Sequence, residues 1–213
     1  MPQVSLSEFV QGICSGEQLA SFPTDTVPAL AGRPDQAQRI FALKQRDFSK
    51  PLILMGATLA ALLPYTQGTP AAQAIWQQTA ERFWPGALTL VVPASDRVPG
   101  AMNPQQTGTI GIRVPNHALA RYLLAQTGPL ATTSVNRSGQ PALQTLAAIE
   151  AAFPQLLTLS ATAHAEIQSA IGQSALAESS SASGKPSTVA IWQETGWQVV
   201  RQGSVYLPPK SSI

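Results

Sequence analysis

Two short segments of the sequence carry residue types that suit a phosphorylated ligand. The segment 44–46 (Lys-Gln-Arg) closes a predicted helix, and the segment 130–136 (Leu-Ala-Thr-Thr-Ser-Val-Asn) ends an apolar strand in hydroxyl and amide side chains. Arginine and lysine donate to phosphate oxygens, whereas serine, threonine and asparagine supply short donors and acceptors. Folded against each other, the two segments predict a pocket for a polyanion with fixed polar contacts for a nucleotide.

Each segment taken alone also fits a structure without function, namely a solvated helix end and a strand-to-turn junction. Other chemical motifs are absent or incomplete. The segment 184–187 (Gly-Lys-Pro-Ser) lacks the Ser or Thr directly after Lys that a phosphate-binding P-loop needs, and no Gly-x-Ser-x-Gly elbow of a hydrolase occurs. Asp25 could bind magnesium, but a lone aspartate after a strand more often serves a turn. His117 and His164 do not have the setting of a general base.

The composition indicates a globular chain. Of its 213 residues, 44% are hydrophobic and 11% are charged, which is too apolar for a disordered protein. The net charge of +2 is too small to argue for nucleic-acid binding by itself. No apolar run reaches the roughly 18–20 residues of a membrane span, and no signal peptide is apparent, so we expect a cytoplasmic protein. The single cysteine, Cys14, lies in the apolar pattern of the first helix and is predicted to be a buried, inert thiol.

The order of predicted elements indicates an α/β domain. Ser5 and Glu8 form a capping-box pattern at the start of a short helix that ends near Gly16. Strands and helices then alternate, and a C-terminal hairpin makes the sheet mixed. We expect one domain over residues 1–206, a short tail over 207–213, no extra C-terminal domain and a mobile loop over 174–184. The predicted helices are 34–46, 71–84, 117–126 and 146–153, and the predicted strands are 19–22, 52–55, 88–92, 109–114, 130–134, 156–159, 188–192 and 197–201.

Seven motifs in a fixed order resemble one known family. They are Phe22-Pro23-Thr24-Asp25-Thr26-Val27, Lys44-Gln45-Arg46 with Lys50-Pro51-Leu52, Trp84-Pro85-Gly86, Thr109-Ile110-Gly111-Ile112-Arg113, Thr132 through Gly139, Ser187-Thr188-Val189 and Arg201-Gln202-Gly203. Each motif is weak by itself, but in this order they resemble the YrdC-like family. Its members are threonylcarbamoyl-adenylate synthases, nucleotidyltransferases that begin the t6A modification of tRNA. The resemblance covers most of the chain and matches the short form of the family.

The resemblance implies a fold, a reaction and a set of binding residues. The fold would be a single-domain, open, twisted mixed sheet with helices, of the YrdC/RibB type, with a concave basic cavity. The reaction would join L-threonine, bicarbonate or CO2, and ATP into L-threonylcarbamoyl-adenylate with release of pyrophosphate. Lys44 and Arg46 would be catalytic, because they can neutralise charge on the departing pyrophosphate. Mg²⁺ would arrive with ATP, and no separate metal site is implied. ATP would be bound by Lys44, Arg46, Lys50, Thr109, Ser134, Asn136 and Arg201, and L-threonine by Thr26, Arg113, Thr132 and Ser187.

Five positions depart from the family pattern. Pro28 and Ala29 replace the usual Tyr-Gly, Asp47 replaces a proline, Met55 replaces a histidine and Ala142 replaces a serine. The tyrosine and histidine positions face the amino acid more than the nucleotide, so the sequence supports nucleotide binding better than threonine specificity.

Three functions therefore stay open at this stage. The first is the synthase, which would pass its product to the downstream t6A transferase machinery and would bind tRNA weakly. The second is a divergent nucleotide-binding paralogue with another small substrate. The third is a module of the same fold that binds tRNA or double-stranded RNA, although the sequence lacks the interleaved aromatic and basic residues of single-strand binders.

Overall fold

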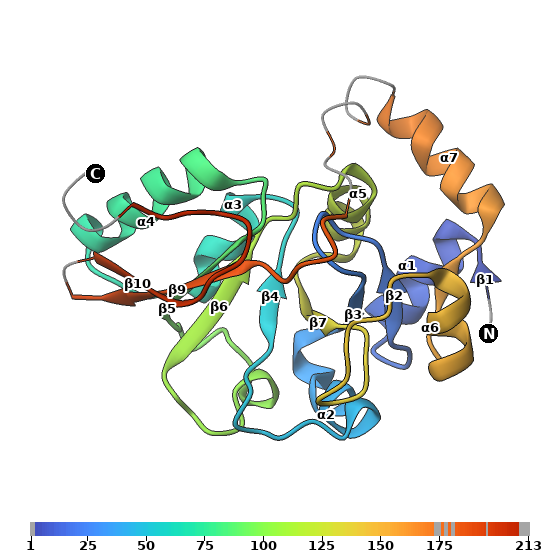
Figure 1. The fold of residues 1–213 in the computed structure, drawn as a ribbon, viewed down its shortest axis with the longest axis horizontal. Coiled ribbons are helices and arrows are strands. Elements are labelled where there is room, and N and C mark those ends of the chain that lie inside the picture. Colours follow the sequence, from blue (N-terminus) through green and yellow to red (C-terminus); the bar gives the residue numbers. More distant parts are fainter. Residues whose placement is uncertain (1–2, 173–175, 177–178, 180–181, 195, 209–213) are drawn as a thin grey trace.

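The fold is an α/β structure built on one long mixed sheet (Figure 1). The computed structural model describes residues 3–172, 176, 179, 182–194 and 196–208. From one edge to the other, its eight-stranded sheet contains β10 (Gly196–Arg201), β9 (Thr188–Gln193), β5 (Leu88–Pro93), β6 (Thr109–Arg113), β4 (Ile53–Met55), β7 (Leu130–Ser134), β3 (Ala29–Gly32) and β2 (Ala20–Phe22). The open, mixed α/β sheet predicted from the sequence is thereby confirmed.

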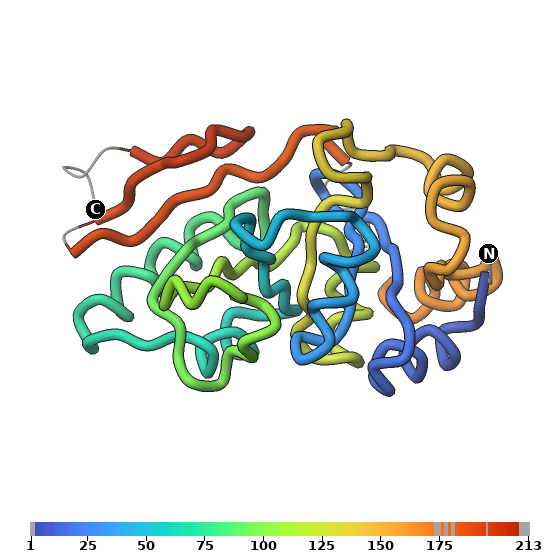
Figure 2. Tube along the Cα trace, turned by 90° about the horizontal axis from the view of Figure 1, so that it is seen from below, coloured from blue at the N-terminus to red at the C-terminus, as the bar shows by residue number. Residues whose placement is uncertain are grey.

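The large sheet contains both parallel and antiparallel strand pairs. The pairs β9–β5 and β6–β4 are parallel, and the other neighbours are antiparallel. A second, two-stranded sheet pairs β1 (Gln3–Val4) with β8 (Thr158–Leu159). The first described residues and the β9–β10 hairpin lie at opposite ends of the molecule (Figure 2).

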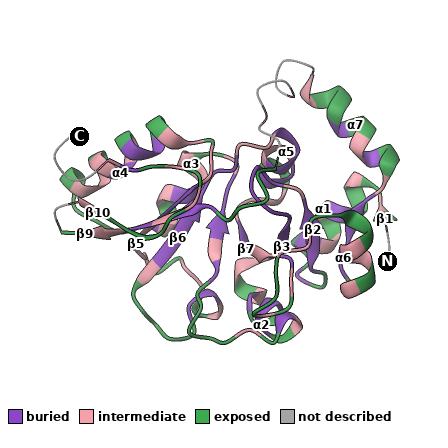
Figure 3. Ribbon diagram, in the orientation of Figure 1, coloured by how far each residue is buried: buried purple, intermediate pink, exposed green. Residues whose placement is uncertain are grey.

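Helices surround the sheet and bury apolar residues against it. The α-helices are α1 (Leu6–Cys14), α2 (Gln38–Lys44), α3 (Leu59–Leu62), α4 (Pro70–Phe83), α5 (Ala118–Thr127), α6 (Leu146–Ala152) and α7 (Ala161–Ile171). Short 3₁₀ turns occur at η1 (Pro34–Gln36), η2 (Leu63–Tyr65) and η3 (Gly100–Met102). The central strands are largely buried, whereas α4 and α7 present exposed residues to solvent (Figure 3). Within the described residues, no helix is long and apolar enough to span a membrane.

Side chains define several helix boundaries as the sequence predicts. The Ser5 side chain accepts from the Glu8 amide, and the Glu8 carboxylate accepts from the Ser5 amide, which completes the capping box. His117 caps α5 through its ring nitrogen, in agreement with a structural role. At the end of α2, Gln45 adopts the left-handed conformation with φ of 50°. This reversal sends Lys44 and Arg46 in different directions, a separation that the sequence spacing does not reveal.

Several elements differ from the sequence predictions. The short strand β3 and helices α3 and α7 were not predicted, and the expected helix from residue 34 consists of a 3₁₀ turn followed by α2. The prediction for Cys14 is wrong, because the last turn of α1 leaves this thiol exposed. Leu207, assigned to the tail, is only 5% exposed and belongs to the main core. The mobile loop predicted over 174–184 lies mostly outside the described residues, and the domain limits remain a prediction.

Candidate active site

One face of the large sheet forms the floor of a cavity of about 570 Å³. Strand register aligns Thr132 with Ile53, Ile53 with Gly111, and Gly111 with Val91, and all four residues line the cavity. Because side chains alternate along a strand, the intervening residues point to the opposite face. Ile110 is one of these and is buried in the core. Thr109, Gly111 and Arg113 therefore share the face of β6 that borders the cavity.

The cavity is positively charged. Among the described residues that line it, three are arginines (Arg46, Arg113 and Arg201), and none is aspartate or glutamate. Burial lowers the pKa of Arg46, and so does the nearby charge of Arg201, whose own pKa is also lowered by burial. Two partly desolvated arginine side chains in one cavity create a site for an anion.

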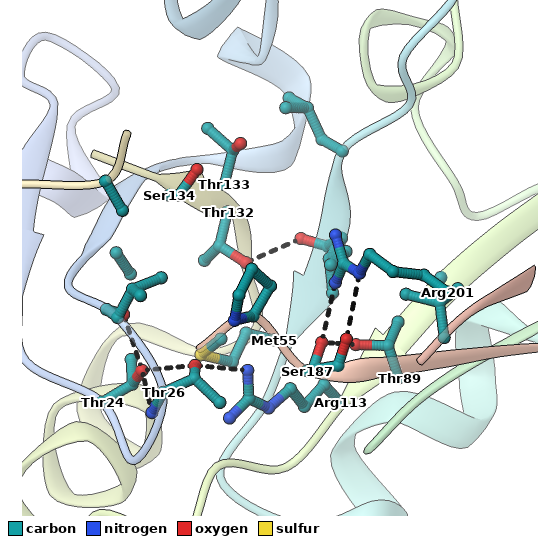
Figure 4. A pocket seen from close by; sticks show the side chains of 18 of the residues that line it. Thr24, Thr26, Met55, Thr89, Arg113, Thr132, Thr133, Ser134, Ser187 and Arg201 are labelled. Carbon is teal, nitrogen blue, oxygen red and sulfur yellow. Dashed lines mark hydrogen bonds between the residues drawn. The ribbon is translucent and has the colours of Figure 1, made fainter. Parts of the chain in front are cut away.

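The buried end of the cavity is organised around Arg113 (Figure 4). This side chain donates from Nε to the Gly86 carbonyl at 3.1 Å, from Nη1 to Thr26 Oγ1 at 2.9 Å and from Nη2 to Asp25 Oδ1 at 2.6 Å. A guanidinium has five N–H groups, so one N–H on each terminal nitrogen is left. Asp25 therefore serves as a buried counter-ion, and the alternative of a magnesium ligand finds no support. Burial lowers the pKa of Arg113, and the charge of Asp25 opposes that effect.

Threonine hydroxyls form a short relay next to this arginine. Thr24 Oγ1 donates to the Val27 carbonyl at 2.8 Å, which uses its only proton. Thr26 must therefore be the donor in its 3.1 Å contact with Thr24. Met55 lies beside Thr26 and Arg113 in Figure 4 and contributes a thioether to the cavity lining. This end of the cavity thus combines a cation with an apolar wall.

A second polar group connects the C-terminal hairpin to the sheet. Arg201 donates to the Ser187 carbonyl at 3.0 Å and to Ser187 Oγ at 3.1 Å, and that hydroxyl lies 2.8 Å from Thr89 Oγ1. Gly203 packs so closely that a Cβ would lie 2.4 Å from the Thr188 nitrogen. The motif Arg201-Gln202-Gly203 therefore requires glycine for packing, and this packing holds the arginine at the cavity.

The end of β7 supplies the third polar group. Ser134 Oγ donates to Asn136 Oδ1 at 2.6 Å, and both residues line the cavity. Arg46 reaches the cavity nearby and donates to the carbonyls of Lys50 and Pro51 at 2.9 and 3.2 Å. Lys44 takes a different position. It is 1% exposed and does not line the cavity, and its ammonium group donates to oxygens of Ser134 and Asn136.

The structure gathers most of the predicted site residues around this cavity. All of the predicted ATP and threonine residues line it except Lys44, which is buried, and Lys50, which is exposed. Pro28 lines a separate, smaller cavity, so among the departures from the family only Ala29, Met55 and Ala142 border the main one. The cavity is also lined by residues that were not predicted as site residues, namely Thr24, Thr89, Thr133, Gln140 and Gln144. The alternation of side chains along β5 was the signal that could have identified Thr89.

No metal site is evident in the described part of the chain. It contains no group of three or more His, Cys, Asp or Glu side chains placed to hold a metal ion. The chemistry of the lining residues is that of anion binding, with arginine, hydroxyl and amide groups.

Comparison with known proteins gives a consistent result. A family model described as "Telomere recombination", which groups Sua5, YciO and YrdC proteins, matches residues 13–203. The threonylcarbamoyl-AMP synthase of Chromohalobacter salexigens is 37% identical over 145 residues, which cover 66% of this chain and 76% of that protein. The threonylcarbamoyl-AMP synthase of Serratia proteamaculans is 36% identical over 150 residues, covering 66% and 77% of the two proteins.

Solved structures share the fold. Sua5 of P. abyssi in complex with L-threonine superimposes with a TM-score of 0.74 at 25% identity, covering 95% of this chain and 56% of that one. This chain therefore spans little more than half the length of that Sua5 protein. YciO of E. coli has a TM-score of 0.75 at 22% identity, covering 96% and 92% of the two chains.

Proposed function

This chain belongs to the Sua5, YciO and YrdC family, and we propose that it is an L-threonylcarbamoyladenylate synthase. In this reaction L-threonine, bicarbonate or CO2, and ATP yield L-threonylcarbamoyl-adenylate and pyrophosphate. The proposed activity is that of a nucleotidyltransferase at the first step of t6A modification of tRNA. The synthase names of the relatives from C. salexigens and S. proteamaculans support the assignment.

One observation carries the proposal: the cavity contains three arginines and no carboxylate among its described lining residues. A cavity with this charge attracts anions, and ATP together with the carboxylate of an amino acid supplies them. The volume of about 570 Å³ lies within the range of 300–1,000 Å³ that is usual for small-molecule and cofactor sites.

The proposed chemistry requires positioning and charge stabilisation. The neutral threonine amine forms an N–C bond with CO2 and releases a proton to solvent, which gives a carbamate. A carbamate oxygen then forms a bond to the α-phosphorus of ATP, and the bond from that phosphorus to the bridging oxygen breaks. Negative charge increases on the departing pyrophosphate, where cationic donors stabilise the transition state.

Arg46 and Arg201 are the side chains best placed for the phosphates. Both line the cavity, and the charge of Arg201 lowers the pKa of Arg46, which indicates that the two guanidinium groups lie within electrostatic reach. An anion between them would remove this repulsion and restore the pKa of Arg46 towards its ordinary value. Thr109 and Ser134 line the same cavity and would add hydroxyl contacts to the nucleotide.

Arg113 is our candidate for the threonine carboxylate. Three of its N–H groups are bound to Gly86, Thr26 and Asp25, and its remaining N–H groups suit a carboxylate oxygen. Thr26, Thr132 and Ser187 are each at most 2% exposed and would surround the rest of the amino acid. The thioether of Met55 would replace the polar contact that the family's histidine offers.

Mg²⁺ enters this proposal only with the nucleotide. The arginine-rich lining does not fit a protein-bound Mg²⁺, which prefers carboxylate and other oxygen ligands. The ion would therefore be held by the triphosphate oxygens and water, and we assign no step to it. The downstream t6A transferase would take up the adenylate product, and we propose that contact with tRNA at the cationic cavity is weak.

Pyrophosphate release tests the proposed function directly. Purified protein is incubated with ATP and Mg²⁺, with and without L-threonine and bicarbonate. We expect release only when both are present. Equal release without L-threonine would contradict the synthase assignment, and release supported by another amino acid in place of threonine would favour the divergent paralogue.

A further inference from the structure

The two cationic side chains at the end of α2 have different surroundings. Arg46 lines the cavity, whereas Lys44 is 1% exposed and points to the end of β7. Gln45 between them is in the left-handed conformation, which explains the different directions. Two cations that are separated by a single residue in the sequence motif can therefore have different functions.

The hydrogen bonds of Lys44 are all made within the protein. Its Nζ donates to the carbonyl of Ser134, to the carbonyl of Asn136 at 2.7 Å and to Asn136 Oδ1 at 2.9 Å. An ammonium group has three donors, so these contacts use all of them. The Lys44 carbonyl, at the open end of the helix, also accepts from the Ser138 amide at 3.2 Å. Lys44 thus contacts the same loop through its side chain and its backbone.

Asn136 is equally occupied. Its Oδ1 accepts from Lys44 and from Ser134 Oγ, and its Nδ2 donates to the carbonyls of Arg137 and Gln140 at 2.9 and 2.5 Å. A side-chain amide offers two acceptor and two donor positions, and all four are used. Neither side chain has a free donor for a phosphate oxygen.

These contacts join Lys44 to the segment 134–144, which we call the cavity loop. Further hydrogen bonds run from the Gln140 amide to the Arg137 carbonyl at 3.0 Å and from the Leu143 amide to the Val135 carbonyl at 3.0 Å. The cavity loop contributes Ser134, Asn136, Gln140, Pro141, Ala142 and Gln144 to the cavity lining.

We infer that Lys44 and Asn136 are positioning residues, which hold the cavity loop in its binding shape and do not bind the ATP phosphates themselves. The assignment of the cavity to a nucleotide rests on the proposed function, whereas the loop contacts do not depend on it. The place of Lys44 in the motif suggests a direct contact with phosphate, whereas this inference assigns it a positioning role.

The two cations provide matched variants. Lys44→Met and Arg46→Met each remove one charge at the same helix end and retain most of the side-chain volume. Calorimetry would compare the affinities of both variants for ATP and AMP. If Lys44 positions the loop, Lys44→Met should weaken ATP and AMP by a similar factor, about tenfold. Arg46→Met should weaken ATP at least ten times more than AMP, because AMP lacks the β- and γ-phosphates.

Amide hydrogen exchange gives a readout that does not depend on nucleotide or product. Exchange at Ser138, Gln140 and Leu143 should be at least tenfold faster in Lys44→Met and unchanged in Arg46→Met. Asn136→Ala should reproduce the pattern of Lys44→Met. The double variant Lys44→Met/Asn136→Ala should bind nucleotide with an affinity within twofold of that of the single variant that binds more weakly. In steady-state kinetics, Lys44→Met should raise KM for ATP and leave KM for L-threonine unchanged.

The opposite outcome is equally well defined. If Lys44→Met weakens ATP far more than AMP and leaves loop exchange unchanged, then Lys44 binds phosphate directly and the inference is wrong. If Lys44→Met does not fold, Asn136→Ala decides through the same measurements. If the wild-type protein makes no adenylate, the proposed function fails, but the exchange measurements still test the positioning role.

Discussion

The buried ion pair between Arg113 and Asp25 allows a quantitative prediction. Their side chains are 5% and 3% exposed, and the Arg113 Nη2 and Asp25 Oδ1 atoms are 2.6 Å apart. Arg113→Met removes the cation and three hydrogen bonds but fills much of the same volume. It leaves Asp25 as a buried carboxylate without its counter-ion.

The expected cost follows from this burial. Removing one partner of a buried ion pair costs about 3–5 kcal/mol, because the other charge remains desolvated. For a protein of this size each kcal/mol lowers Tm by about 2–4 °C, so Arg113→Met should lower Tm by roughly 6–20 °C. Asp25→Asn should be destabilising for the same reason, since it leaves the Arg113 cation without its counter-ion.

Urea unfolding of both single variants and of Arg113→Met/Asp25→Asn measures the coupling. The double variant should be more stable than the sum of the single changes predicts, by about 1–3 kcal/mol. Arg113→Met should also lose L-threonine binding in calorimetry, while Asp25→Asn should weaken it less. Two single variants that each cost less than about 1 kcal/mol and add without coupling would refute the assignment of Asp25 as a required counter-ion.

Three further predictions concern the threonine end of the cavity, Lys44 and RNA. Met55→His should strengthen L-threonine binding in the presence of ATP by about 1–2 kcal/mol, because it restores a polar contact. An unchanged affinity in calorimetry would exclude Met55 from the amino-acid site. Burial, together with the charge of Arg46, lowers the pKa of Lys44 from 10.5 to about 7. The unfolded chain therefore binds more protons than the folded chain between these pH values, and the free energy of unfolding should rise with pH there relative to Lys44→Met. This prediction would be contradicted if the difference in the free energy of unfolding between the wild-type protein and Lys44→Met did not change from pH 7 to pH 9. Binding of tRNA should be weak and should fall steeply with salt, since phosphate contacts alone would hold it; tight binding at high salt would favour the RNA-binding module.

The sequence predicted the elements whose local signals are strong. The capping box located α1, and the alternation of apolar and polar residues located β6 with its polar face towards the cavity. The strand β3 was missed because Ala29–Gly32 is four residues long and lacks the β-branched residues that mark strands. Tertiary pairing with β2 and β7 forms this strand, and such pairing leaves no local pattern.

The site was predicted as a set of residues but not in its detailed contacts. The predicted arginines and hydroxyl groups line one cavity, and their roles in binding stay a prediction. The orientation of Lys44 depends on the left-handed turn at Gln45, which is a residue type with no special preference for that conformation. The pairing of Arg113 with Asp25 depends on contacts 88 residues apart in the chain. Side-chain direction and long-range pairing follow from the packed structure, so a motif alone does not reveal them.

The most direct test of the proposed function is to follow labelled carbon into the adenylate product. The protein is incubated with ¹³C-bicarbonate, L-threonine, ATP and Mg²⁺, and the nucleotide products are analysed by mass spectrometry. Arg46→Ala should raise the activation free energy by about 2–4 kcal/mol, which lowers the rate roughly 30- to 900-fold. Arg97→Ala removes an exposed arginine that does not line the cavity and is the matched control.

We expect a ¹³C-labelled threonylcarbamoyl-adenylate with the wild-type protein and the control, and a greatly reduced amount with Arg46→Ala. A wild-type protein that binds ATP and L-threonine but transfers no labelled carbon to the nucleotide would contradict the synthase assignment.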